Sequence, residues 1–219
     1  MCQDCRVSPR PYGGVTADRR RAGRRAALLE AALDLLGTEG VQGTSLRAVC
    51  ARAGLNPRYF YESYADLDAL LADVHDRIVT EVADAAAQGV AAAGPDADLR
   101  TTVRSAAMAA LDLGRADPRK VRVVLIEAAA SPVLRARRQG ARRRYTRLVI
   151  DYARQFYDIP PAAGARMHFA ATMLVAGWGE NLIAWLDGEF ETTPSALADM
   201  FADAAEALAT HAADRARPT

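Results

Sequence analysis

The stretch from Thr44 to Tyr64, TSLRAVCARAGLNPRYFYESY, constrains the fold of this chain more than any other segment. Four of its apolar residues recur at i, i+3, i+4 and i+7: Leu46, Val49, Cys50 and Ala53. This spacing predicts a short helix with one buried face, and the hydroxyl of Thr44 or Ser45 can cap its start. Gly54 then allows a sharp break in the backbone.

A second short helix is predicted directly after this break. Asn56 can cap its first turn, and Pro57 stands at its first position, where a missing amide hydrogen is harmless. Two short helices joined by a glycine turn form a helix-turn-helix, whose second helix enters the major groove of DNA. The solvent side of this second helix carries Pro57, Arg58, Tyr59 and Tyr61. The segment therefore predicts DNA binding.

Apolar residues at helical spacing continue along the rest of the chain, and no segment alternates as a strand would. We predict a helix over residues 18–38 before the motif and a longer one over residues 66–88 after it. The Gly-Pro pair in the sequence AAAGPDAD, residues 91–98, then stops the helical pattern. Five more helices are expected, over residues 97–113, 119–129, 132–157, 162–186 and 194–214. The fold class is therefore all-α, with nine helices.

The charge of the chain is distributed unevenly. Residues 1–64 hold ten arginines and six acidic residues, a net charge of +4, which leaves −3 for the rest because the whole chain carries +1. A basic end on a mildly acidic body suits a protein that contacts a polyanion through one domain. No apolar run approaches the ~18 residues of a membrane span, and the Arg-rich N-terminus lacks the apolar core of a signal peptide. We therefore expect a cytoplasmic protein with no membrane partner.

The sequence offers little for metal or catalytic chemistry. Cys2 and Cys5 form a single CxxC, without a second Cys or His pair to complete a zinc site. They lie in residues 1–17, whose Pro, Gly and scattered polar residues predict a disordered N-terminal arm. The three histidines stand beside no recognisable nucleophile, and no phosphate-binding loop is present. We therefore expect no enzyme, no cofactor and no metal.

On the residues above, the chain resembles the TetR family of bacterial transcriptional regulators, chiefly over residues 24–82. The first helix, RRAALLEAALDLLGTEG, and the motif, TSLRAVCARAGLNPRYFY, have the family's paired alanines, AG turn and capped recognition helix. Leu67 departs from the family pattern, which has a phosphate-contacting Lys there, and Tyr64 replaces the usual Phe. The resemblance implies a helix-turn-helix DNA-binding domain over residues 18–65 and a ligand-binding and dimerisation domain over residues 66–219.

The recognition helix supplies the main candidates for DNA contact. Arg58 can form bidentate hydrogen bonds with a guanine, and Tyr59 can offer its hydroxyl to a phosphate or its ring to a thymine methyl group. The resemblance implies further phosphate contacts from Thr44 and Tyr61, and Arg47 is another candidate for the DNA backbone. The predicted interface comprises Thr44, Ser45, Arg47, Asn56, Pro57, Arg58, Tyr59 and Tyr61.

Three neighbours of this interface have other expected roles. Phe60 and Tyr64 should point inward and hold the recognition helix in place. Glu62 would repel phosphate, so it should face away or pair with an arginine. The arginines within residues 19–25 leave two interpretations open, namely a basic arm that enters the minor groove and a solvated helix start.

Polar residues stranded among apolar ones mark the candidate effector site, because a buried polar group needs a bonding partner. The candidates of this kind are Glu127, Tyr145, His168, Trp178 and Asn181, and Met108 and Met173 are added as adaptable apolar lining residues. They are alternatively core or interface residues that satisfy one another. The surrounding composition favours a mostly hydrophobic pocket and a small lipophilic or aromatic effector. The seven arginines within residues 135–147 are interpreted as a solvated face, with an anionic-ligand or DNA site as the alternative.

The resemblance implies a homodimer formed through the last two helices, and their apolar faces support a partner. A two-fold dimer places two recognition helices about 34–36 Å apart, on successive major grooves. We therefore expect a repressor released from a palindromic operator by its effector. The alternative is a constitutive or protein-partnered DNA-binding regulator without a small-molecule effector.

Overall fold

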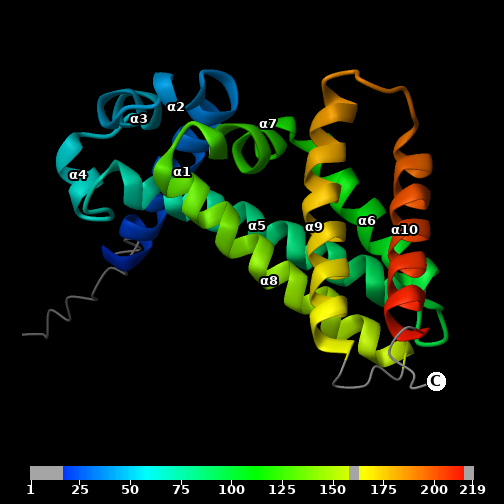
Figure 1. Cartoon of the computed structure of the whole chain (residues 1–219). Coiled ribbons are helices and arrows are strands. Elements are labelled where there is room, and N and C mark those ends of the chain that lie inside the picture. Colours follow the sequence, from blue (N-terminus) through cyan, green and yellow to red (C-terminus); the bar gives the residue numbers. More distant parts are fainter. Residues whose placement is uncertain (1–16, 158–162, 215–219) are drawn as a thin grey trace, which may run out of the picture.

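The structure, a computed structural model, describes residues 17–157 and 163–214, and every regular element in these ranges is helical (Figure 1). The α-helices are α1 Ala17–Thr38, α2 Gly40–Gly43, α3 Leu46–Ala53, α4 Pro57–Tyr61, α5 Leu67–Ala93, α6 Leu99–Ala116, α7 Pro118–Val121, α8 Pro132–Phe156, α9 Gly164–Leu186 and α10 Pro194–Asp214. Between α7 and α8 lie a π-helical turn, η1 Arg122–Ile126, and a 3-10 turn, η2 Glu127–Ala129. The all-α prediction is confirmed.

Two details differ from the predicted set of nine helices. A short extra helix, α2, begins at Gly40, whose φ of 73° lets the chain turn immediately after α1. The single helix expected over residues 119–129 is instead α7 followed by η1 and η2, because the amide of Glu127 bonds the carbonyl of Arg122 in a π-helical turn. Periodicity alone did not reveal either change in the backbone path.

The helices are arranged around the long helix α5 (Figure 1). Helices α1 to α4 gather at its first half, and we call this group the head. Helices α6, α9 and α10 pack together at the other end, where α6 contacts both α5 and α10, and α8 runs from the head to α9. We call residues 94–214 together with the second half of α5 the body.

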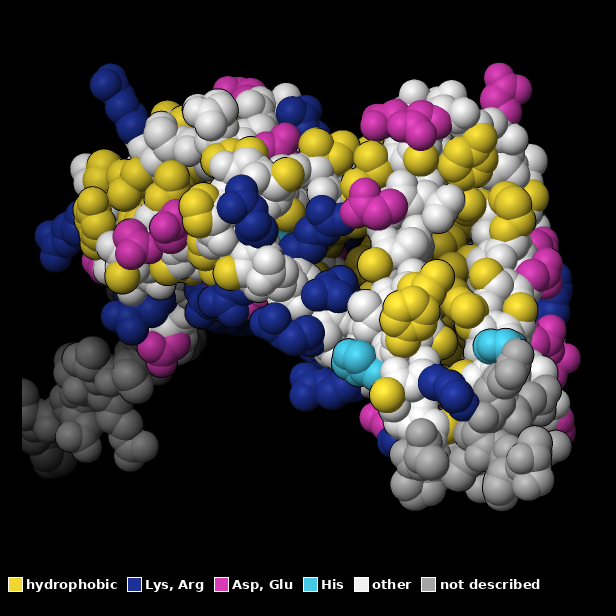
Figure 2. Space-filling view, in the orientation of Figure 1, with side chains coloured by type: hydrophobic (Ala, Val, Ile, Leu, Met, Phe, Trp, Pro, Cys, Tyr) yellow, Lys and Arg dark blue, Asp and Glu magenta, His cyan; other side chains and the backbone are white. Residues whose placement is uncertain are grey.

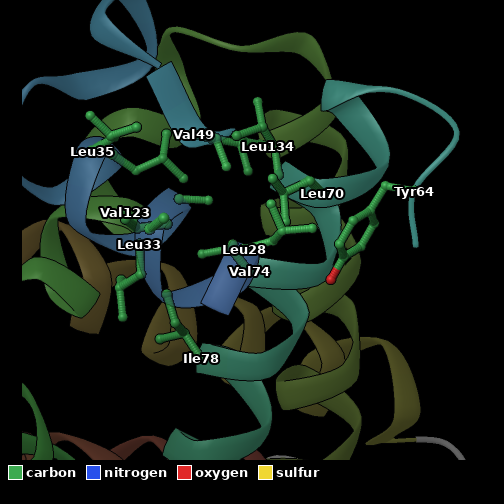
Figure 3. Close-up of a cluster of buried hydrophobic side chains, with 14 of the residues drawn as sticks. Leu28, Leu33, Leu35, Val49, Tyr64, Leu70, Val74, Ile78, Val123 and Leu134 are labelled. Atoms are coloured by element: carbon green, nitrogen blue, oxygen red, sulfur yellow. The ribbon is translucent and has the colours of Figure 1, made fainter. Parts of the chain in front are cut away.

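One hydrophobic core holds the head together and continues into the body (Figure 3). It joins fully buried side chains of α1, α3, α4 and α5 to Val123 of η1 and Leu134 of α8. The predicted domain division between residues 65 and 66 falls inside this core, and it remains a prediction. Burial of this apolar surface is the main force that keeps the head on the body.

A second cluster closes the far end of the body. Trp178 of α9 and Phe201 of α10 lie with ring centroids 4.3 Å apart, packed against Ala107 and Leu111 of α6. The indole Nε1–H of Trp185 donates to the carbonyl of Thr192 at 3.0 Å. Helices α6, α9 and α10 are therefore joined by a continuous apolar contact.

Helices α9 and α10 expose several large apolar side chains. Phe169 and Met173 of α9 are 67% and 51% exposed, and Met200 of α10 is 49% exposed. By length and composition α9 could cross a membrane, and only 17% of its most apolar window is buried. Figure 2 shows hydrophobic side chains over the visible surface of α9 and α10.

Candidate nucleic-acid interface

Local hydrogen bonds build the helix-turn-helix as the sequence predicts. The Ser45 hydroxyl accepts from the Ala48 amide at 3.2 Å and caps α3. Gly54 ends α3 with a φ of 65°, a left-handed conformation that favours glycine. Asn56 Oδ1 accepts from the Arg58 amide at 3.0 Å, and Pro57 opens α4. These caps fix the orientation of α4 relative to α3.

The side chains of α4 divide sharply between core and solvent. Phe60 is fully buried, and Tyr64, just after α4, is 6% exposed, so the prediction that both point inward is confirmed. On the opposite side, the Arg58 side chain is 85% exposed and Tyr61 is 62% exposed. Tyr59 is 38% exposed. Arg58, Tyr59 and Tyr61 therefore share one surface that a nucleic acid can reach.

Thr44 has a different position from the other predicted contacts. It is 5% exposed, and its hydroxyl donates to the Gly40 carbonyl at 2.8 Å. The hydroxyl therefore joins α2 to the start of α3, and its phosphate contact stays a prediction. Arg47 is exposed on α3, whereas Arg52 of the same helix pairs with Asp34 and Glu39.

Arg24 braces the recognition helix from α1. Its guanidinium carbon lies 4.5 Å from the ring centroid of Tyr59, and its Nη2 lies 2.8 Å from Glu62 Oε2. Glu62 Oε1 also lies 3.8 Å from Arg58 Nε, so the prediction that Glu62 pairs with an arginine is confirmed. Sequence reasoning missed the contact between Arg24 and Tyr59, because it joins residues 35 positions apart on different helices.

A second arginine explains the tyrosine at position 64. The Tyr64 hydroxyl donates to Asp73 Oδ2 at 2.6 Å and accepts from Arg25 Nε at 3.2 Å. Arg25 also donates to Asp73 at 2.8 Å. Burial alone would raise the pKa of Asp73, but the hydrogen bonds from Tyr64 and Arg25 outweigh it and hold that pKa below its ordinary value. The three side chains tie α1 to the start of α5.

The arginines of residues 19–25 lie within α1, which supports a helix start over an extended arm. Ala17 already belongs to α1, and the rest of the predicted arm, with Cys2 and Cys5, lies outside the described residues. At Leu67, where the family has a lysine, the side chain packs against the head's core. The arginines of the head that the structure describes therefore lie on α1, α3 and α4.

Comparison with known proteins agrees with this geometry. Residues 28–74 match the sequence profile of a family described as bacterial regulatory proteins, tetR family. The N-terminal domain is a TetR-family DNA-binding domain. Its members are regulators of transcription rather than enzymes, and the matched residues include α3, α4, Tyr64 and Asp73. No curated protein matches the chain.

Solved structures show the same fold over most of the chain. A transcriptional regulator from Pseudomonas aeruginosa PAO1 is 20% identical with a TM-score of 0.69, over 93% of this chain and 96% of that one. A TetR family regulator from Marinobacter aquaeolei VT8 is 24% identical with a TM-score of 0.56, over 85% and 97% of the two chains. The multidrug binding protein EbrR, complexed with imidazole, is 20% identical with a TM-score of 0.62, over 83% and 94%. These likenesses concern the fold.

The structure does not gather the seven candidate effector residues into one site. Met108 and Trp178 share the apolar cluster of α6, α9 and α10. The Tyr145 hydroxyl donates to the Val79 carbonyl at 2.9 Å and so joins α8 to α5. Three others, His168, Met173 and Asn181, are exposed on α9. Their roles in ligand binding stay predictions.

Glu127, the seventh candidate, lies at the junction of head and body. It is 7% exposed, and its carboxylate accepts from the Val41 amide at 2.8 Å and from Arg122 Nε at 2.9 Å. Both of its oxygens therefore have partners within the protein. The turn η1, which directly precedes Glu127, contacts α1, α5 and α9.

None of the seven candidates lines either of two hollows in the described parts of the chain. One, of about 80 Å³, lies between α1, α5 and α7 beside Leu33, Ile78 and Lys120. The other, of about 310 Å³, is an open depression beside Tyr64 and Arg137. Residues 17–157 and 163–214 contain no group of three His, Cys, Asp or Glu side chains that could hold a metal ion.

The seven arginines within residues 135–147, on α8, are partly paired. Arg137 lies 3.0 Å from Asp76 and Arg138 lies 2.7 Å from Glu180, while Arg135 donates to the Ala129 carbonyl at 2.7 Å. The remaining four are exposed: Arg142, Arg143, Arg144 and Arg147. This pattern supports a solvated face with acidic neighbours.

Proposed function

We propose that this protein is a homodimeric transcriptional repressor that binds a palindromic operator and leaves it when a small lipophilic or aromatic molecule binds the body. DNA-binding regulation is what the family of the N-terminal domain supports. The surface of α4 is the observation that carries the proposal, because Arg58, Tyr59 and Tyr61 are exposed there on a helix whose inner face is locked by Phe60.

In this proposal Arg58 reads a base and its neighbours hold the DNA backbone. A guanidinium that is free on one face can bond the O6 and N7 atoms of guanine. Tyr61 and Arg47, which are both exposed, contact phosphates in this proposal. Phosphate contacts position the protein without specifying sequence. The bond of Arg24 to Glu62 reduces the repulsion that this carboxylate would exert on phosphate.

The exposed apolar faces of α9 and α10 support a homodimer. Phe169 and Met173 expose more than half of their surface within a single chain, and a second copy of the same helices would cover them. Two copies then present two recognition helices to successive major grooves. We therefore assign α9 to the dimer contact. A bacterial regulator that acts on DNA in this way works in the cytoplasm.

The effector is proposed from composition and from one similar structure. EbrR, whose structure contains imidazole, is described as a multidrug binding protein. The cluster around Trp178 and Met108 is the most aromatic part of the body and suits a small lipophilic or aromatic molecule. The scattered positions of the other candidates favour a second function, a DNA-binding regulator without a small-molecule effector. A thermal-shift screen of lipophilic and aromatic compounds separates the two.

A gel shift with DNA from upstream of the protein's own coding sequence tests the DNA-binding proposal. We expect the wild type to form a discrete complex that random DNA competes for poorly. Arg58→Ala should weaken it by about 1–3 kcal/mol, the value of one bidentate base contact. Arg115→Ala is the matched control, because it removes the same charge from an exposed position on α6. Equal weakening by both variants would show that Arg58 contributes only general charge.

A further inference from the structure

Residues 37–41, where α1 ends and α2 begins, lie directly against the body, and we call this segment the rear turn. A Cβ atom added at Gly37 would lie 2.4 Å from Arg119 Cβ, and one added at Gly40 would lie 2.9 Å from Glu127 Oε2. At Gly37 the obstacle includes the backbone Cα of Arg119, and Gly40 has a φ of 73°, so both positions favour glycine. The head therefore meets the body through backbone at this point.

Directional bonds hold this contact in addition to the apolar core. Glu127 Oε2 accepts from the Val41 amide at 2.8 Å, and its Oε1 accepts from Arg122 Nε at 2.9 Å. Arg122 Nη1 then reaches back to the head and donates to the Thr38 carbonyl at 3.2 Å. Arg122 and Glu127 therefore grip the rear turn from both of its ends. Apolar contacts have no such preferred direction.

The π-helical turn η1 makes this grip possible. In an α-helix each residue rotates by about 100°, so side chains five positions apart point about 140° away from one another. In a π-helical turn the i to i+5 hydrogen bond brings these positions toward the same side. The Glu127 amide makes this bond to the Arg122 carbonyl, and the two side chains meet. Such turns are often found at functional sites.

Arg119 extends the contact along α1. Its Nη2 lies 3.1 Å from Glu30 Oε1 and its Nη1 lies 3.4 Å from Asp34 Oδ1. Asp117 holds the same guanidinium from the body side, at 2.9 Å from Nε. These pairs run beside the rear turn, so they resist a rotation of α1 about it.

We propose that Arg122 and Glu127 are positioning residues for operator recognition, which fix the angle at which the head leaves the body by clamping the rear turn. This inference rests on the proposed function, in which the two heads of a dimer occupy two half-sites. Helix α4 lies at the end of the head away from α7 (Figure 1), so a small rotation at the rear turn displaces α4 along the DNA. The clamp thereby sets the half-site spacing that the dimer accepts.

The test compares Arg122→Gln and Glu127→Gln with Arg104→Gln in the full chain. Arg104 is the matched control, because its side chain is 35% exposed against 40% for Arg122 and it pairs with Asp199 at 2.8 Å within the body. Each arginine variant removes one positive charge. The first measurement is hydrogen exchange of the amides in residues 37–43. The second is the Kd for a single half-site and for duplexes whose two half-sites differ in separation by one base pair.

We expect the Val41 amide to exchange about tenfold faster in both clamp variants. Glu127→Gln replaces the charged acceptor of this amide by a neutral one, and Arg122→Gln removes the guanidinium that holds the carboxylate in place. The preference for one half-site separation should fall by about the same factor, while the single half-site Kd and the Arg104→Gln protein stay unchanged. Unchanged exchange and unchanged spacing preference in Arg122→Gln would overturn the clamp, and so would an equal loss in Arg104→Gln. If Arg122→Gln fails to fold, the same two measurements on Glu127→Gln decide the question.

The two measurements also separate the clamp from the proposed function. If the wild type binds all separations equally, the dimeric operator proposal fails, and with it the role of the clamp in spacing. If the Val41 amide still exchanges faster in the clamp variants, Arg122 and Glu127 hold the rear turn but do not set the half-site spacing. If the wild type prefers one separation but the clamp variants keep that preference, only the positioning inference fails.

Discussion

Replacing Tyr64 by Phe tests the tie between α1 and α5 with the smallest possible change. The phenyl ring fills the same buried space, while the hydroxyl's bonds to Asp73 at 2.6 Å and to Arg25 at 3.2 Å are lost. A hydrogen bond to a charged group contributes about 1.5–3 kcal/mol. Asp73 keeps its bond from Arg25, and their side chains are 29% and 54% exposed, so water weakens the tie and we expect a loss of about 1–1.5 kcal/mol.

The assay is thermal unfolding between pH 3 and pH 8. For a chain of this size the loss lowers Tm by about 2–6 °C. Because the pKa of Asp73 is held below its ordinary value of 3.8, the ionised form is favoured in the folded state. Its contribution is complete above the unfolded pKa and is lost as pH falls through the folded pKa. The difference between variant and wild type should stay constant from about pH 5 to 8 and shrink below about pH 4.

Tyr157→Phe is the control for this experiment, since the Tyr157 hydroxyl bonds Thr210 at 3.1 Å on the exposed side of the body. It should leave Tm almost unchanged. A Tyr64→Phe protein as stable as the wild type at pH 7 would refute the reasoning. A loss that persisted undiminished at pH 3 would show that Asp73 is not the partner that matters.

Three further substitutions test backbone conformation, packing and association. Gly54→Ala should lower the free energy of unfolding by about 1–2 kcal/mol in urea titrations, because a φ of 65° is unfavourable for alanine. Nothing lies within 4 Å of the new Cβ, so the loss reports backbone conformation and not a clash. An unchanged value would mean that the turn adopts another conformation. Gly89→Ala places a Cβ 2.4 Å from the Ser105 carbonyl oxygen and should cost about 2–3 kcal/mol, whereas Gly140→Ala, in open space on α8, should stabilise by about 0.5–1 kcal/mol. Phe169→Asp should convert a dimer to a monomer in sedimentation velocity, while Leu148→Asp, 46% exposed on α8, should not; the opposite result would move the interface away from α9.

The helix-turn-helix could be predicted from the sequence because its determinants are local. Ser45, Gly54 and Asn56 act on amides or dihedral angles within three residues of themselves. The same holds for the inward face of α4, where Phe60 follows from helical spacing. Such features need no knowledge of how distant segments pack.

The partners of Glu127 and Tyr64 could not be predicted in the same way. Glu127 stood out as a polar residue among apolar ones, yet its partner is the Val41 amide, 86 positions away. That pairing depends on a π-helical turn, which apolar periodicity does not indicate. Tyr64 was recognised as a departure from the family, and its hydroxyl needs Arg25 from another helix.

Helix α9 shows a different limit. Because it is apolar on nearly every side, spacing alone did not separate the residues that face the body from those that face outward. His168 and Met173 were predicted to contact an effector and lie on the exposed surface, whereas Met167 and Leu174, which were not singled out, are buried. Assignment of its faces required the positions of α8 and α10.

The continuity of the main core bears on how this DNA reader can be transplanted. A chimaera that joined residues 1–65 to a different protein would remove Leu70, Val74 and Ile78 from the core. The helix-turn-helix would then lose the α5 side chains against which it packs. The smallest exchangeable unit therefore ends beyond Ile78, and the host must also supply apolar side chains in place of Val123 and Leu134. In this chain the recognition helix can therefore be transferred only together with the part of α5 that supports it.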